Sequence, residues 1–188
     1  MLRNIFSVPF YSTILDKSII NDTQSKVLSK LHLLDNLEGS KNSYQKTDFF
    51  EQNQIVGPNE LEELFININQ HAVKFAEESN ILLNLSVKYW IQNYSNNDYH
   101  QPHSHSKHDI SGVYYVQADK NSGPIIFNNP NPYIIGYNSF INPKIEKDQQ
   151  YLEVKPQPGL LILFPSYLVH QVVPSQNSIR TVIAFNYG

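Results

Sequence analysis

Apolar residues recur every three or four positions in two segments near the start of the chain. Residues 23–35 carry one such stripe, behind an Asp22–Thr23 pair suited to capping a helix. Residues 58–79 carry a longer stripe behind Pro58, a residue that a first helical turn tolerates. The spacing predicts two helices, with a polar loop over residues 36–57 between them.

After residue 82 the pattern changes to a period of two, or to short apolar runs bounded by Gly, Pro and Asn. This pattern predicts about eight short strands. They cover residues 83–94, 110–117, 124–128, 133–137, 150–155, 160–164, 169–173 and 180–186. Many short strands at regular spacing are typical of a jelly roll, sandwich or barrel. We expect one domain over residues 1–188, in which the helices of residues 1–82 support a β core over residues 83–188.

The amino-acid composition excludes several kinds of functional site and partner. The 188 residues include no cysteine, which excludes disulfides, thiolate metal sites and a cysteine nucleophile. The formal net charge is -3 and no run of Lys and Arg stands out, so a nucleic-acid partner is not expected. No apolar run reaches the roughly 20 residues that span a bilayer, and no signal peptide is apparent. We therefore expect a cytoplasmic protein without a membrane partner.

Histidines cluster in residues 99–116, "YHQPHSHSKHDISGVYYV". His103 and His105 are two positions apart, and on a strand such residues point to the same side and can bind one ion. A third candidate, His170, lies between two strongly apolar runs. Three imidazoles match the ligand count of an open catalytic metal site.

The other histidines have simpler interpretations. His100 and His108 flank the pair in polar sequence, where we expect them to be solvated or to support a ligand. His32 and His71 belong to the helical half and are expected to be ordinary helix residues.

Arg180 begins the last apolar run, ten residues after His170. An arginine at the start of a strand can simply extend into solvent. Beside a metal site, however, a guanidinium is a natural bidentate partner for the carboxylate of a bound organic acid.

Together these residues resemble the Fe(II)/2-oxoglutarate-dependent oxygenases, in particular the prolyl-4-hydroxylase-like branch and its small bacterial and phage relatives. Tyr94 precedes His103 by nine residues, as a tyrosine does in that family. "ISGVYYV" is similar to the family strand that ends in tyrosine, and "PGLLILFPSYLVHQVVP" resembles the segment that carries the distal histidine, His170. The resemblance covers residues 85–187.

The resemblance implies a double-stranded β-helix, which is a distorted jelly roll. It implies that His103 and His170 bind Fe(II), and that Arg180 holds the distal carboxylate of the co-substrate 2-oxoglutarate with help from Tyr115 and Tyr94. His103, His170 and Arg180 would then be the catalytic residues of a dioxygenase that hydroxylates a small-molecule or peptidyl substrate.

One position departs from the family pattern. The second iron ligand of the family is Asp or Glu, whereas His105 stands there in this chain. Either His105 completes a three-histidine site, or Asp109 supplies the carboxylate. Strand geometry favours His105.

Two alternatives remain open. A cupin-type metal protein would also use His103, His105 and His170, with Asp109 as its acid, but it gives Arg180 and the two tyrosines no role. A jelly-roll binding module without a metal would use aromatic side chains to line a groove. For Trp90, which lies on an apolar strand, core packing is the expected role. Residues 36–57 and 129–149 are expected to shape a substrate pocket, and oligomeric state is not indicated.

Overall fold

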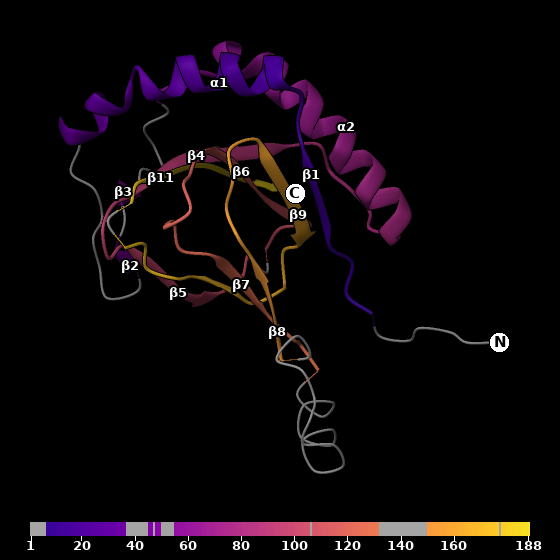
Figure 1. The fold of residues 1–188 in the computed structure, drawn as a ribbon. Coiled ribbons are helices and arrows are strands. Elements are labelled where there is room, and N and C mark those ends of the chain that lie inside the picture. Colours follow the sequence, from indigo (N-terminus) through magenta and orange to yellow (C-terminus); the bar gives the residue numbers. More distant parts are fainter. Residues whose placement is uncertain are drawn as a thin grey trace.

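Two facing β-sheets with helices across one outer face make up the fold (Figure 1). The computed structural model describes residues 7–36, 45–46, 48–49, 55–105, 107–131, 150–176 and 178–188. All statements about structure concern these residues.

The larger sheet has the strand order β1-β9-β6-β11-β4-β3, and every neighbouring pair in it is antiparallel. Its strands are β1 (Tyr11–Ile14), β3 (Asp48–Phe49), β4 (Val87–Tyr94), β6 (Ile110–Gln117), β9 (Leu160–Pro165) and β11 (Arg180–Tyr187). The smaller sheet has the order β2-β5-β10-β7-β8 and is also antiparallel. Its strands are β2 (Gln45–Lys46), β5 (Tyr99–His103), β7 (Ile125–Asn128), β8 (Tyr151–Val154) and β10 (His170–Val172).

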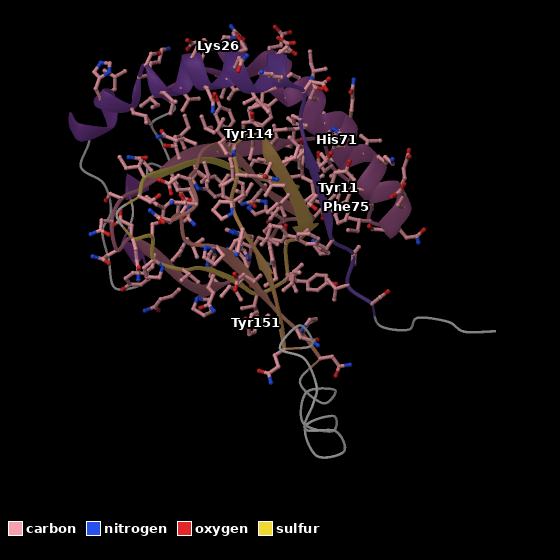
Figure 2. All side chains as sticks on the ribbon, in the orientation of Figure 1. Tyr11, Lys26, His71, Phe75, Tyr114 and Tyr151 are labelled. Atoms are coloured by element: carbon pink, nitrogen blue, oxygen red, sulfur yellow. The ribbon has the colours of Figure 1, made fainter. Side chains whose placement is uncertain are left out.

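The helices are α1 (Lys17–Leu28) and α2 (Glu62–Ser79), with short 3-10 turns at η1 (Leu31–Asn36) and η2 (Pro58–Leu61). The apolar stripe of α2 packs on the larger sheet, where the ring centroids of Phe65 and Tyr89 are 4.8 Å apart. Tyr114 belongs to the same core cluster, between the sheet and the helices (Figure 2). No helix in the described part of the chain is long and apolar enough to span a membrane.

Alternation along the central strands separates two cores. One set of side chains packs under the helices, and the opposite set faces the space between the two sheets. This second set includes Tyr94, Tyr115 and Val182, which pack with Ile125 and Phe164. The inner face of the larger sheet is therefore the wall on which a ligand site can form.

The expected mainly β structure with N-terminal helices is confirmed. The strand predicted at 110–117 has the observed bounds, and those predicted at 124–128, 150–155, 160–164, 169–173 and 180–186 are correct to within one or two residues. The strand predicted at 133–137 lies outside the described residues.

Several boundaries were wrong. The helix predicted at 23–35 is α1, which begins at Lys17 behind Asp16 rather than behind the Asp22–Thr23 pair. Residues 31–36 form a 3-10 turn, and residues 83–86 precede β4 rather than belonging to it. The loop predicted at 36–57 contains the two-residue strands β2 and β3, each paired to the end of a longer strand. Strands β1 and β5 were not predicted.

Candidate functional site

A cavity of about 500 Å³ opens between the two sheets. Most of its lining residues on β4, β6 and β11 alternate along the strand. They are Lys88, Trp90, Gln92 and Tyr94 on β4; Ser111, Val113 and Tyr115 on β6; and Arg180, Val182, Ala184 and Asn186 on β11. Val87, Tyr89, Gly112 and Phe185 also border the cavity. The smaller sheet contributes histidines to the facing wall.

Three imidazoles meet in this cavity. His103 ends β5 and is the cross-strand partner of His170, which begins β10. One nitrogen from each of His103, His105 and His170 lies within 4.8 Å of the others. The structure therefore brings the three histidines singled out in the sequence into one cluster.

The expected strand geometry of His103 and His105 is wrong, because β5 ends at His103 and His105 lies in the turn beyond it. The turn is held in place when the backbone N–H of His105 donates to the carbonyl of Ser166 at 2.7 Å. The ring centroid of His105 lies 5.1 Å from that of His103 and 5.3 Å from that of His170. A turn tied to the loop after β9 therefore brings the imidazoles together.

Backbone carbonyls set the tautomers of two of these rings. Nδ1 of His103 donates to the carbonyl of Gln101 at 2.7 Å, and Nδ1 of His170 donates to that of Leu168 at 2.9 Å. Since a carbonyl only accepts, each Nδ1 carries the proton and each Nε2 keeps a lone pair for a ligand.

Burial keeps the cluster neutral. It lowers the pKa of His105 to about 4, with a further contribution from the neighbouring imidazoles, and it lowers the pKa of His170 well below the usual range. The pKa of His103 is lowered for the same reason, against a smaller raising effect of its bond to Gln101. Neutral imidazoles with free lone pairs are the form that binds a metal ion.

His100 and His108 also line the cavity and are half-buried, so neither is simply solvated. The ring of His100 stacks on that of His103 with centroids 3.8 Å apart, and burial lowers the pKa of His100 to about 3. Nδ1 of His108 is buried and has no hydrogen-bond partner among the described residues.

Asp109, the alternative ligand, is not brought to the cluster. Its carboxylate Oδ2 accepts from the backbone N–H of Asn84 at 3.4 Å, and it does not line the cavity. Its own backbone pairs with Tyr187 and Ser166, so Asp109 closes the turn that carries His105.

Arg180 forms the opposite end of the site and is only 1 % exposed. Its guanidinium carbon lies 4.2 Å from the ring centroid of Tyr94. Nη1 donates to the carbonyl of Gly123, whereas Nη2 is buried with no partner in the described part of the chain. Burial raises the pKa of Tyr115 to about 12 and raises that of Tyr94 as well, so both phenols are neutral beside this cation.

Gly123 positions the carbonyl that holds Arg180. A Cβ at this residue would collide with the backbone carbonyl of Val173 and come within 2.8 Å of the carbonyl oxygen of Pro174. Only glycine permits this close approach of two backbones.

Gln92 was missed in the sequence. Its side chain is 4 % exposed, its Oε1 accepts from the hydroxyl of Tyr94 at 3.1 Å, and its Nε2 has no partner among the described residues. Gln92 is the cross-strand partner of Val182, so it lies diagonally across from Arg180 on the same face. The sequence feature that could have indicated Gln92 is its position two residues before Tyr94, because residues two apart on a strand lie on the same face.

The prediction that Trp90 packs in the core was also wrong. Trp90 is half-buried and lines the cavity, with its ring centroid 6.2 Å from that of His105. Trp90 shares its face with Gln92 and Tyr94, whereas Ile91 packs in the core under the helices.

Residues 88–186, more than half of the chain, match the profile of a family described as "Putative 2OG-Fe(II) oxygenase". The chain belongs to the 2OG-Fe(II) oxygenase family. This family implies Fe(II) as the metal and 2-oxoglutarate as the co-substrate, and the three-histidine cluster fits an iron site, because imidazole is a good ligand for iron.

Solved structures of other oxygenases share the fold. A prolyl-4-hydroxylase from Pseudomonas putida superposes with a TM-score of 0.69 at 11% identity, over 96% of this chain and 92% of that one. A prolyl hydroxylase from Trichoplax adhaerens, in complex with a hypoxia inducible factor peptide, gives 0.66 at 13% identity, over 95% and 82%. HygX from Streptomyces hygroscopicus, with nickel and 2-oxoglutarate bound, gives 0.61 at 10% identity, over 96% and 83%.

These likenesses confirm the jelly-roll fold expected from the sequence. No curated protein sequence is significantly similar to this chain.

Proposed function

We propose that this protein is an Fe(II)- and 2-oxoglutarate-dependent dioxygenase that hydroxylates a small-molecule or peptidyl substrate. The observation that carries the proposal is the buried guanidinium of Arg180, whose Nη2 has no described partner, in the same cavity as the His103–His105–His170 cluster. A buried cation without a counter-ion is costly, and an anionic ligand removes that cost.

His103, His105 and His170 are the residues that would hold the iron. The carbonyls of Gln101 and Leu168 keep the protons of His103 and His170 on Nδ1 and so aim Nε2 into the cavity. When bound, iron together with 2-oxoglutarate and dioxygen supplies the oxidising power for hydroxylation, and 2-oxoglutarate leaves as succinate and carbon dioxide.

Arg180 would bind the distal carboxylate of 2-oxoglutarate through Nη2, while Gly123 and the Tyr94 ring fix the guanidinium. Gln92 presents a second N–H group, one without a partner in the described part of the chain, to the same end of the cavity. The hydroxyl of Tyr94 donates to Oε1 of the Gln92 amide, so Nε2 of Gln92 remains to bind the ligand. Val182 and its cross-strand partner Tyr115, both buried and on the same face as Arg180, add apolar surface at this end that excludes water.

The relatives of known structure support a co-substrate of this kind. HygX is described with 2-oxoglutarate and nickel bound, and the Trichoplax adhaerens protein with a peptide. A cupin-type protein could use the same three imidazoles, but the family match and the roles available to Arg180 and Gln92 favour the oxygenase.

Titration calorimetry tests the proposal. The protein is loaded with Ni(II), which binds imidazoles and does not turn over, and is then titrated with 2-oxoglutarate. We expect saturable binding that requires the metal and is abolished in a His103→Ala His170→Ala variant. Absence of metal binding, or of metal-dependent 2-oxoglutarate binding, would overturn the proposal.

A further inference from the structure

The cavity continues well past the residues assigned to 2-oxoglutarate. Arg180 pairs with Tyr94 at one end of the β11–β4 ladder, and Asn186 pairs with Lys88 at the other. These pairs are six positions apart on extended strands, a length of about 20 Å. Trp90, which lies beside His105, comes between them.

The cavity thus has a buried inner end at Arg180 and an outer end at Lys88, whose side chain is exposed, and Trp90 with its neighbour His105 lies between them. Both ends belong to the same lining. In the function proposed above, the outer end is the space left for the prime substrate.

The charges of the described lining residues have one sign. Lys88 and Arg180 are cations, and no Asp or Glu is present among these residues. The imidazole cluster adds no negative charge, because His105 stands where the family has a carboxylate. One carboxylate of 2-oxoglutarate would offset the charge of Arg180 and the other would offset one of the two charges of a divalent iron, which leaves one positive charge at the metal and that of Lys88 uncompensated.

The polar groups at the outer end complement this charge. The Oδ1 of Asn186 accepts from the hydroxyl of Ser111 at 2.7 Å, so the amide nitrogen is the part of Asn186 left to bind a ligand. Ser111 is fixed in turn by the hydroxyl of Ser166 at 2.8 Å. His108 adds a buried Nδ1 that has no described partner.

We propose that the prime substrate carries an acidic group, a carboxylate or a phosphate, and that Lys88, Asn186 and His108 bind this group at the outer end of the cavity. This proposal rests on the proposed function, since it assigns the inner end to 2-oxoglutarate. Trp90 would then contact the part of the substrate that lies next to the metal. The same positive field would disfavour cationic substrates.

The test compares matched small molecules on protein loaded with Ni(II) and 2-oxoglutarate. A library of carboxylates and phosphate monoesters is paired with the corresponding amides and alcohols, starting with phenylacetate against phenylacetamide and benzyl phosphate against benzyl alcohol. Binding is measured by ligand-observed NMR and calorimetry. We expect the acids that bind to do so about tenfold or more tightly than their neutral partners. The carboxylate and phosphate arms show which acidic group is preferred.

Substitutions of Lys88 test whether this residue causes the preference for acids. Lys88→Glu should abolish the preference for acids, and Lys88→Gln should reduce it several-fold, while the affinity for 2-oxoglutarate is unchanged. Lys155→Glu is the matched control, because Lys155 is exposed and does not line the cavity. His105→Asp, which adds a carboxylate to the cluster, should also weaken the binding of acids.

The proposal is overturned if neutral or cationic members bind best, if no acid binds, or if Lys88→Glu behaves like Lys155→Glu. Failure of the proposed function is distinguished beforehand, because the same preparation must first show metal-dependent binding of 2-oxoglutarate.

Discussion

Arg180 and Tyr94 are cross-strand partners on β11 and β4, and the guanidinium carbon of Arg180 lies 4.2 Å from the centroid of the Tyr94 ring. The ring faces the cation without neutralising it, since burial keeps the phenol protonated by raising its pKa. The pair therefore presents a buried positive charge to the cavity and fixes its direction. This arrangement suits a ligand that brings its own carboxylate.

Replacement of Arg180 by Met, which preserves much of the side-chain volume, should weaken 2-oxoglutarate binding about 30-fold or more. The expectation follows because the loss of one partner of a buried charge pair costs about 2–5 kcal/mol. Metal affinity should be unchanged, as Arg180 is not part of the imidazole cluster. Calorimetry with 2-oxoglutarate and with Ni(II) separates these effects, and equal 2-oxoglutarate affinity in both proteins would contradict the assignment.

Gln92 is expected to contribute a hydrogen bond to the same carboxylate. Gln92→Met should raise the dissociation constant of 2-oxoglutarate about 10- to 100-fold, because a hydrogen bond to a charged group contributes about 1.5–3 kcal/mol. Gln92→Glu should be worse, since it adds a negative charge beside the ligand. If Gln92→Met binds 2-oxoglutarate as tightly as the parent protein, Gln92 does not bind the carboxylate.

His105 is expected to be a direct metal ligand. His105→Ala should weaken Ni(II) binding by more than about 100-fold, a larger loss than that for residues that only support ligands. His105→Asp should retain metal binding, because a carboxylate is also a suitable ligand. Asp109→Asn is the control for the alternative assignment: if it abolishes metal binding while His105→Ala does not, Asp109 is the ligand.

The buried histidines predict how stability depends on pH in the metal-free protein. The pKa of His105 is lowered to about 4 and that of His100 to about 3, whereas both rings in the unfolded chain have the ordinary value of 6.5. Between about pH 6.5 and pH 4 the unfolded chain therefore binds more protons than the folded chain. The free energy of unfolding should fall as the pH decreases through this window and should be fully recovered above it.

Urea denaturation at pH 7.5 and pH 5 measures this dependence. A His100→Gln variant should lose less stability on acidification than the parent, while His32→Gln, at an exposed position, should behave like the parent. An equal loss in all three proteins would show that His100 is not responsible.

Periodicity in the sequence located the elements whose pattern is local. Ile110–Gln117 and Arg180–Tyr187 are recognisable because buried strands need runs of apolar residues, and α2 is recognisable by its stripe. Strand β1 contains only four residues of alternating burial, and it forms by pairing with β9, about 150 residues further along the chain. The local sequence around β1 does not indicate which distant strand it pairs with, so β1 could not be predicted from it.

The residues of the candidate site could likewise be predicted only in part. The resemblance to oxygenases indicated His103, His170 and Arg180, and the spacing of His103 and His105 indicated His105; the structure brings all four into one cavity. The resemblance did not indicate Gln92, because the role of that residue depends on the hydroxyl of Tyr94 and on the burial of its own amide. Trp90 was misplaced because a strand between two cores has apolar residues on both faces, so hydrophobicity alone does not show which face is the cavity.

The central claim is that His103, His105 and His170 hold an iron that 2-oxoglutarate chelates while Arg180 binds its far carboxylate. Anaerobic addition of Fe(II) and then 2-oxoglutarate, followed by visible absorption spectroscopy, tests it most directly. We expect a weak charge-transfer band that needs both additions and that requires far more 2-oxoglutarate in Arg180→Met. A protein that binds Fe(II) but shows no band at saturating 2-oxoglutarate would contradict the account.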